Sequence, residues 1–454
     1  MIKSIMHHHR YNLLASCFIL CAIGFRLFLT AHNWPVTDSE EGTMGLEALH
    51  IAFRGEHPIY LYGQSYMGVG EAYLGAVIFH LFGVSIFSLR LGMLFLFSLF
   101  LLLIYLLGSL LYGKKVACIA ILLMIGGAQN VLLPEMQAVG GDVETLVCGS
   151  LMLLLASWLA LSDAAKQFVW QRKFAYSGWG LAVGLGLWSH LLVVPFVLCS
   201  SLLLFFFCRR ELRGTAGLFI LSGFIVGAMP LIIYNITAPV GDNTLAVFIS
   251  LHQTTYPNAP SGIVLWLKQL SGTFLYTLPI ATGLPQIISN SVLPLYSPLQ
   301  LQALPAVLLY GVWSMSYLAL LSGSTLYHLK RIVLLRHKKR VATVISLNER
   351  QSLVLYTARL MMLMCAWLTI LSYLTSSTSA QRPWSFRYLI GLMIVLPALI
   401  APLVNGQTWT KYSWQKLRKF LSVFLIILML GVSVIGTTQS ILERVLERRR
   451  GANI

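Results

Sequence analysis

The short apolar stretch Gly70-Glu-Ala-Tyr-Leu-Gly-Ala-Val-Ile-Phe-His-Leu-Phe82 decides how this chain is threaded through a membrane. Its 13 residues are too few to cross the hydrocarbon core, which takes about 20 helical residues. We therefore expect a helix that lies along the membrane surface. If the stretch crossed, Lys114 and Lys115 would face outward, and the acidic stretches before and after it would lie on opposite membrane faces.

The composition of the chain indicates an integral membrane protein. Of its 454 residues, 57% are hydrophobic and only 10% are charged, with a mean hydropathy of +0.77. A soluble domain has about 25% charged residues. Apolar runs of about 20 residues recur, and these must be helices because lipid cannot satisfy exposed backbone groups. The sequence thus predicts an all-α polytopic membrane protein of about 11–12 transmembrane helices, with surface helices in the first outer loop, and excludes soluble and β-barrel classes.

The net charge of +17 does not indicate a nucleic-acid-binding protein. Lysine and arginine fall in short clusters between the apolar runs, as expected of cytoplasmic loops, and no contiguous basic domain could hold a duplex. The seven cysteines lie in or at the ends of apolar runs, so we interpret them as small packing residues and not as a disulfide or metal framework.

The apolar runs divide the chain into three parts. We expect residues 1–234 to form a transmembrane core with an outer loop at 30–88, residues 235–302 an outer or re-entrant segment, and residues 303–454 the C-terminal transmembrane helices. Ile263–Leu284 could cross or not, so the count is 11 or 12. The other expected spans are Leu13–Leu29, Leu89–Tyr112, Val116–Leu133, Val143–Leu161, Tyr176–Trp188, the descent from there to Arg209, Ala216–Tyr234, Ala303–Leu321, Leu353–Leu374, Tyr388–Val404 and Phe420–Ile435.

Nine of the fifteen acidic residues lie in two stretches that this topology places at the same membrane face. They are Asp38, Glu40, Glu41, Glu47, Glu56, Glu71, Glu135, Asp142 and Glu144. A carboxylate is costly to keep near hydrocarbon, so such a cluster indicates chemistry or ion binding. The alternative for Asp38, Glu40 and Glu41 is a solvated loop that caps the following helix, since acids are favoured at helix N-termini.

The stretches Asp38–His50, Arg54–Tyr60 and Gly83–Leu91 resemble the GT-C polyprenyl-phosphate-sugar glycosyltransferases, in particular the protein O-mannosyltransferase and lipid A aminoarabinose transferase branch. The resemblance covers about residues 20–200. It rests on an ordered set of short motifs: Arg26-Leu27, Glu40-Glu41, Gly55…Pro58-Ile-Tyr60, Tyr73-Leu74 and Phe82-Gly83…Leu89-Arg90-Leu91. The family pair is usually Asp-Glu, so the pair Glu40-Glu41 departs from the pattern.

The resemblance implies an inverting glycosyltransferase of the plasma membrane. It would move a hexose or pentose, in the manner of a mannosyltransferase, from a polyprenyl-phosphate donor to a lipid, glycan or protein acceptor of the cell envelope, with its active site on the outer face. It also implies a surface helix before the second span, a second acidic site at Gly140-Gly-Asp-Val-Glu144 and an outer-face Arg387-Tyr-Leu389.

Transfer requires a carboxylate that takes the acceptor's proton and a cation that stabilises the leaving phosphate. We assign the base to Glu40 or Asp38, and expect Glu40→Gln and Asp38→Asn each to reduce transfer by orders of magnitude. Glu41 and Asp142 would support the base or bind a divalent metal.

Arg387 is the preferred phosphate contact, with Arg26 and Arg90 as further candidates. Glu144 could support the site or cap its helix. His190 could contact substrate or metal, or be a satisfied interfacial histidine.

Two other functions fit a chain of this kind. A transporter or glycolipid flippase would need charges at mid-membrane in broken helices, often with internal repeats, whereas here the acids cluster at one face and no repeat is visible. A non-catalytic partner with the same fold would have lost the active carboxylates, whereas Asp38, Glu40, Glu41 and Asp142 are present.

Overall fold

The computed structural model describes residues 2–162, 169–239, 241–244, 246–247, 261–287, 304–341, 347–382 and 385–405, together with residues 431, 438 and 442. The predicted span 420–435 and the arginine-rich tail lie almost entirely outside these residues.

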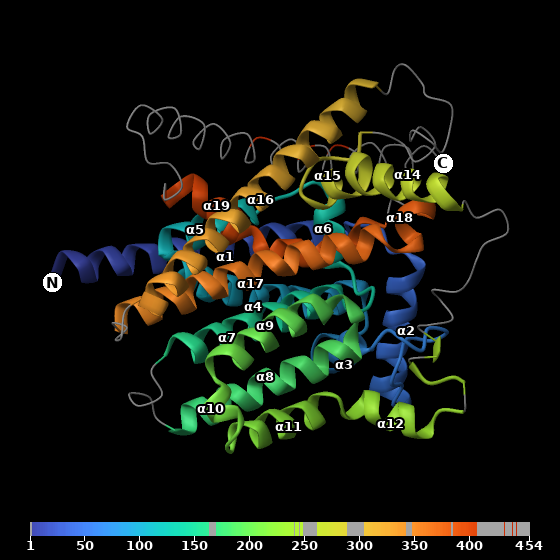
Figure 1. Cartoon of the computed structure of the whole chain (residues 1–454). Helices are drawn as coiled ribbons and strands as arrows, with labels where there is room; N and C mark the ends of the chain where they lie inside the picture. The colour runs from blue at the N-terminus through green and yellow to red at the C-terminus, as the bar shows by residue number, and fades with distance from the viewer. Residues whose placement is uncertain are drawn as a thin grey trace.

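Long helices run side by side through the described part of the chain and form a bundle (Figure 1). Within the described residues, six stretches are long and apolar enough to cross a membrane, so this is a multi-pass membrane protein. They belong to α1 (Ile2–Ala31), α4 (Ile86–Tyr112), α7 (Asp142–Leu161), α16 (Leu304–Val341), α17 (Leu347–Leu374), and η5 (Phe386–Val395) with α19 (Leu396–Asn405). Between them pack α8 (Val169–Ser189) and α9 (Val194–Phe207). The total of 11 or 12 spans counts shorter helices and residues outside the described part, so it stays a prediction.

Two segments that we expected to be single helices are interrupted, and a third contains a π turn. The expected span 116–133 is α5 (Lys114–Leu123) and α6 (Gln129–Met136), separated at Gly126-Gly127, where two residues of low helix propensity follow each other. The expected span 216–234 is α11 (Ala216–Gly227) and α12 (Met229–Thr237), which meet at 64°. The undecided segment 263–284 is α14 (Gly262–Gly272), a π turn (Thr273–Thr277) and α15 (Leu278–Ala281).

Two helices of the first outer loop complete one end of the bundle. The helix α2 (Ser39–Arg54) begins at the Asp38 cap, ends at the left-handed Gly55 and runs across the direction of the bundle helices (Figure 1). The helix α3 has the bounds expected from sequence, Gly70–Phe82, and packs against α2 and α4. Its 13 residues are too short to span the membrane, as expected.

The closest backbone approach in the bundle is between α8 and α11. A Cβ atom added to Gly223 would lie 2.0 Å from the Ser177 carbonyl oxygen, and one added to Gly180 would lie 2.1 Å from the Ile220 carbonyl oxygen. Gly184 and Gly227 repeat this contact one turn further along. Both helices therefore carry a Gly-x3-Gly motif, which lets membrane helices approach closely. The sequence interpretation missed this pair of motifs, although both are visible in it.

Candidate functional site

An ion pair between Glu40 and Arg387 connects an early and a late part of the chain. It lies at the end of the bundle where α2 is placed. Glu40 lies in the first turn of α2, and Arg387 lies at the start of η5. The Arg387 Nη1 atom donates to the Glu40 Oε2 atom at 2.5 Å. The two side chains are 34% and 22% exposed, so both groups can be reached by solvent or substrate.

Asp142 adds a second carboxylate to this pair. It is the first residue of α7 and is buried, and its Oδ2 atom has no hydrogen-bond partner. Its charge interacts with those of Arg387 and Glu40. The structure therefore brings Glu40, Asp142 and Arg387 together, from three distant parts of the chain. Because the Arg387 guanidinium is bound to Glu40, a phosphate could bind it only by competing with that hydrogen bond.

The turn before Asp142 is held by two further carboxyl groups. Gly140 and Gly141 have φ values of +88° and +83°, which side chains other than that of glycine rarely adopt. The Gly140 N–H donates to the Glu71 Oε2 atom at 3.0 Å, and the Gly141 N–H donates to the Glu144 Oε2 atom at 2.9 Å. The same Glu144 oxygen accepts a bond from the Ser189 hydroxyl at 2.9 Å. Glu144 therefore caps the start of α7, which is one of the two alternatives expected for it, and its support of the site stays a prediction.

Two of the predicted site arginines are engaged elsewhere. The Arg90 Nε and Nη2 atoms donate to the two oxygens of Glu41 at 2.7 and 2.6 Å, and both side chains are buried. Arg26 is fully buried and binds Glu135, while its other donors reach carbonyl oxygens of the surrounding helices. These pairs neutralise charge inside the fold, so neither Arg26 nor Arg90 presents a free cation to a phosphate.

Asp38 is placed as a helix cap. Its Oδ1 atom accepts the Glu41 N–H at 2.8 Å, its backbone is extended, and its side chain is exposed. This is the geometry of an N-cap residue, whose oxygen satisfies one of the free N–H groups of the first turn. Of the two candidate bases, Glu40 and not Asp38 is the one that contacts Arg387.

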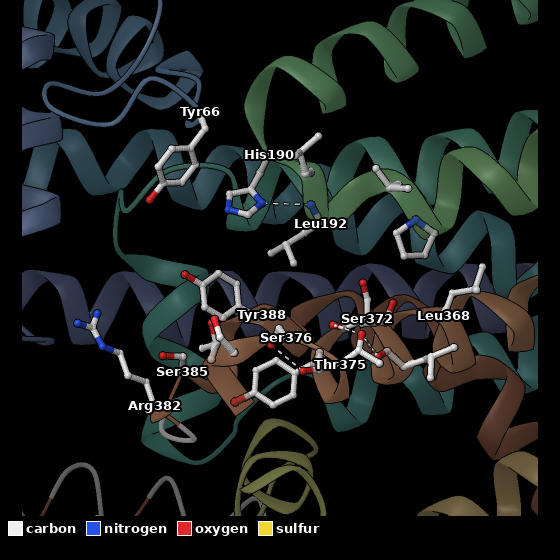
Figure 2. Close-up of a pocket in the computed structure, with 18 of the residues that line it drawn as sticks. Tyr66, His190, Leu192, Leu368, Ser372, Thr375, Ser376, Arg382, Ser385 and Tyr388 are labelled. Carbon is white, nitrogen blue, oxygen red and sulfur yellow. Dashed lines mark hydrogen bonds between the residues drawn. The ribbon is translucent and has the colours of Figure 1, made fainter. Parts of the chain in front are cut away.

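A cavity of about 670 Å³ lies beside the ion pair, between α9 and α17 (Figure 2). Its apolar lining includes Leu192 just before α9, Pro195 and Leu198 on α9, and Leu368 on α17. Polar side chains come from the end of α17 and the segment after it, among them Ser372, Thr375, Ser376, Gln381 and Arg382. A cavity with both apolar and polar lining suits a ligand with a lipid chain and a polar head.

Tyr66, His190 and Tyr388 line the part of this cavity that is nearest to the ion pair. In Figure 2 the ring of His190 lies between those of Tyr66 and Tyr388, with a centroid distance of 6.3 Å to Tyr388. Burial, and then the charge of Arg387, lower the pKa of His190 to about 4, so the ring is neutral at pH 7. Its Nδ1 atom accepts the Leu192 N–H at 3.1 Å, which makes Nε2 the protonated nitrogen and a hydrogen-bond donor.

The expected metal would be bound by Glu41 and Asp142. Arg90 donates to both oxygens of Glu41, so Glu41 is not free to bind a metal together with Asp142. Among the residues that the structure describes, no three His, Cys, Asp or Glu side chains are grouped so that they could hold a metal ion. A metal on Glu41 and Asp142 therefore stays a prediction, and no step below uses it.

The sequence interpretation missed most of the cavity wall and the role of Glu71. Glu71 was counted among the acids of the outer loop without an assigned role. The hydroxyl-rich run Ser372-Tyr-Leu-Thr-Ser-Ser-Thr378, at the outer end of a span, was a visible signal for a polar site that we did not use.

Comparison with known proteins identifies the fold but not the sequence family. No family model matches the chain, and no curated protein sequence does. Among solved structures, the oligosaccharyltransferase of Archaeoglobus fulgidus in the apo form matches with a TM-score of 0.53 at 14% identity, over 95% of this chain and 56% of that one. The same enzyme, AglB, in complex with an inhibitory peptide and a dolichol-phosphate gives 0.51 at 13% identity, over 96% and 56%.

A third match is ArnT from Cupriavidus metallidurans bound to undecaprenyl phosphate, with a TM-score of 0.39 at 14% identity, over 87% of this chain and 79% of that one. This score is too low to carry an argument. The chain spans little more than half the length of the archaeal enzyme, and identities near 14% show the fold alone. The comparison confirms the predicted all-α, GT-C-like fold class, while the O-mannosyltransferase and aminoarabinose transferase branch stays a prediction.

Proposed function

We propose that this protein is a membrane glycosyltransferase that moves a sugar from a polyprenyl phosphate to an acceptor hydroxyl at the outer face of the plasma membrane. The observation that carries the proposal is the convergence of Glu40, Asp142 and Arg387 beside a cavity that is lined by both apolar and polar side chains. That arrangement supplies a base, a cation and a place for a lipid chain. The similarity of fold to a GT-C enzyme supports it.

The proposed reaction is a single displacement. The acceptor oxygen forms a bond to the anomeric carbon while the bond from that carbon to the phosphate oxygen breaks, and its electron pair stays on the polyprenyl phosphate. The acceptor proton passes to Glu40. Because no covalent sugar–enzyme intermediate forms, the configuration at the anomeric carbon is inverted.

Arg387 has two consecutive roles in this mechanism. Without donor, it is bound to Glu40 and interacts with Asp142. When the donor phosphate binds, it competes with Glu40 for the guanidinium, and the released carboxylate becomes free to accept a proton. Asp142 is buried and stays beside Arg387, where it keeps the guanidinium oriented toward the phosphate. The His190 Nε2–H and the Tyr66 hydroxyl are positioned to contact the head group from the cavity wall.

The test is incubation of the purified protein with a panel of polyprenyl-phosphate sugars, with and without divalent ions, and measurement of the free polyprenyl phosphate released. We expect release with at least one donor. Arg387→Ala should reduce kcat/KM by about 100-fold or more, since removal of one charge-stabilising group from a preorganised site has effects of that order.

The control variant is Arg382→Ala, which removes a guanidinium of the cavity wall that is not part of the Glu40 ion pair. We expect it to raise KM for the donor more than it lowers kcat. No release with any donor, combined with transbilayer movement of a glycolipid in proteoliposomes, would instead establish the flippase alternative.

A further inference from the structure

Glu71 is a fully buried carboxyl group near the site that the proposed mechanism does not use. It lies in the first turn of α3, and its Oε2 atom accepts the Gly140 N–H. Its Oε1 atom has no hydrogen-bond donor as a partner. An unpaired carboxylate oxygen in such a position costs free energy, so it needs a partner.

The group that Glu71 faces is another carboxyl group, that of Glu144, which lies within hydrogen-bonding reach. The Glu144 Oε1 atom also lies close to α3, since a Cβ atom added to Gly70 would be 2.5 Å from it. Burial, and then the charge of Glu144, raise the pKa of Glu71 well above its usual range. Two carboxyl groups at this distance are stable when they share one proton, because then one oxygen donates and the other accepts.

The hydrogen bonds to Glu144 indicate which group holds the proton. Glu144 accepts bonds from the Gly141 N–H and the Ser189 hydroxyl, so its oxygens are used as acceptors, and a third donor from Glu71 fits them. Glu71 accepts one bond on Oε2 and has Oε1 left to donate. The pattern corresponds to a neutral Glu71 and an ionised Glu144.

We propose that Glu71 and Glu144 form a proton-sharing clamp on the Gly140-Gly141 turn, and that this clamp positions Asp142 against Arg387. Each carboxyl group holds one of the two consecutive glycine N–H groups that precede Asp142. The clamp thereby fixes the start of α7 relative to α3 and to Ser189, at the end of α8. Both residues are positioning residues, since neither contacts the Glu40–Arg387 pair. The kinetic test of this inference depends on the proposed function, whereas its structural test does not.

The test depends on a difference between two glutamine variants. In Glu71→Gln, the amide reproduces a neutral Glu71, with an oxygen for the Gly140 N–H and an N–H that donates to Glu144. In Glu144→Gln, one oxygen is replaced by a donor, so the Gly141 N–H, the Ser189 hydroxyl and Glu71 lose acceptors. We expect Glu71→Gln to keep kcat within about threefold of wild type. Glu71→Ala and Glu144→Gln should lower kcat about 100-fold with a nearly unchanged KM for the donor, as expected when a catalytic group is misplaced by about 1 Å.

The structural readout is hydrogen exchange of the Gly140 and Gly141 amides, which does not depend on turnover. Exchange should be slow in wild type and Glu71→Gln and faster in Glu71→Ala and Glu144→Gln. Glu56→Gln, a change at a partly exposed residue of the same loop, is the matched control and should leave both readouts unchanged. Equal behaviour of the two glutamine variants, or slow exchange in Glu71→Ala, would overturn the clamp. If wild type releases no polyprenyl phosphate, the proposed function fails, while the exchange measurement still decides the clamp.

Discussion

Glu40 and Glu41 are neighbours in sequence but have different environments. Successive residues of a helix point about 100° apart, so one side chain of such a pair can face the interior while the other faces the site. Glu41 is fully buried and bound to Arg90, whereas Glu40 is partly exposed and reaches Arg387. The acidic stretch therefore contains one structural carboxylate, one helix cap and one candidate base.

The first prediction separates the cap from the base. Asp38→Asn keeps an oxygen for the Glu41 N–H, so we expect activity within about threefold of wild type, because asparagine is as good an N-cap as aspartate. Glu40→Gln removes the proton acceptor and should lower kcat by about 100-fold or more, the range of general acid–base catalysis. The measurement is release of polyprenyl phosphate, with thermal unfolding as the control for folding. A large loss in Asp38→Asn with an unchanged unfolding temperature would return the role of base to Asp38.

The second prediction concerns Glu47, on the buried face of α2. Its Oε1 atom accepts the Tyr62 N–H at 2.6 Å, and its Oε2 atom has no partner. Burial raises the pKa of Glu47 to about 7 against a usual 4.5. The unfolded chain therefore loses this proton more readily, so the contribution of Glu47 to stability is full below about pH 4.5 and is lost as the pH rises toward 7.

Glu47→Gln should remove this pH dependence and raise the unfolding temperature at pH 8, measured by tryptophan fluorescence in detergent between pH 4.5 and 8. Glu56→Gln is the control, because a hydrogen bond from Tyr62 lowers the pKa of Glu56 and gives its contribution the opposite sign. An unchanged slope in Glu47→Gln would show that Glu47 is ionised in the folded protein.

At the residue scale, topology and motif order predicted that Glu40, Asp142 and Arg387 lie near one another, and in the structure they do. Their roles in a reaction stay predictions. The ion-pair partners of Arg26 and Arg90 could not be predicted from the sequence. Glu135 and Glu41 are 109 and 49 residues away from them, and such pairing depends on the folded structure.

At the scale of elements, the paired glycine motifs of α8 and α11 are the clearest link between sequence and packing. Small residues let the two backbones approach until carbonyl oxygens lie where Cβ atoms would be. The interrupted helices, in contrast, were not predicted from the sequence. Hydrophobicity predicted the spans at 116–133 and 216–234, but it does not register local breaks, such as those after Met124 and at Ala228.

The third prediction uses these glycines. Gly223→Ala should lower the unfolding temperature, because its methyl group would clash with the Ser177 carbonyl, and overpacking of this kind costs about 1–3 kcal/mol. Gly24→Ala, in α1, is the matched control, since nothing lies within 4 Å of the added Cβ atom. The higher helix propensity of alanine should leave that variant at least as stable as wild type. Equal unfolding temperatures for the two variants would contradict the close approach of α8 and α11.

At the scale of the whole molecule, the position of α3 determines which loops share a membrane face. Because α3 is short and packs against α2 and α4, the loop that carries Glu40 and the turn that carries Asp142 lie at the same end of the bundle (Figure 1). This agrees with the arrangement expected from the basic loops, and it could be predicted because length and charge both constrain it.

The fourth prediction tests this arrangement in a membrane. In a variant without the exposed Cys17 and Cys21, a cysteine at Val36 should react with a membrane-impermeant maleimide on intact cells. A cysteine at Lys115 should react only after the membrane is permeabilised. Reaction of both positions from the same side would mean that α3 crosses the membrane and that the acidic residues do not form one site.

The Glu40–Arg387 pair joins residues that are 347 positions apart in the chain. During synthesis, the N-terminal partner is made and inserted long before the ribosome reaches the C-terminal one. A nascent chain therefore holds Glu40 and Asp142 without Arg387, and under the proposed mechanism it would lack the cation that binds the donor phosphate. Activity should appear late and abruptly during biogenesis, once η5 docks.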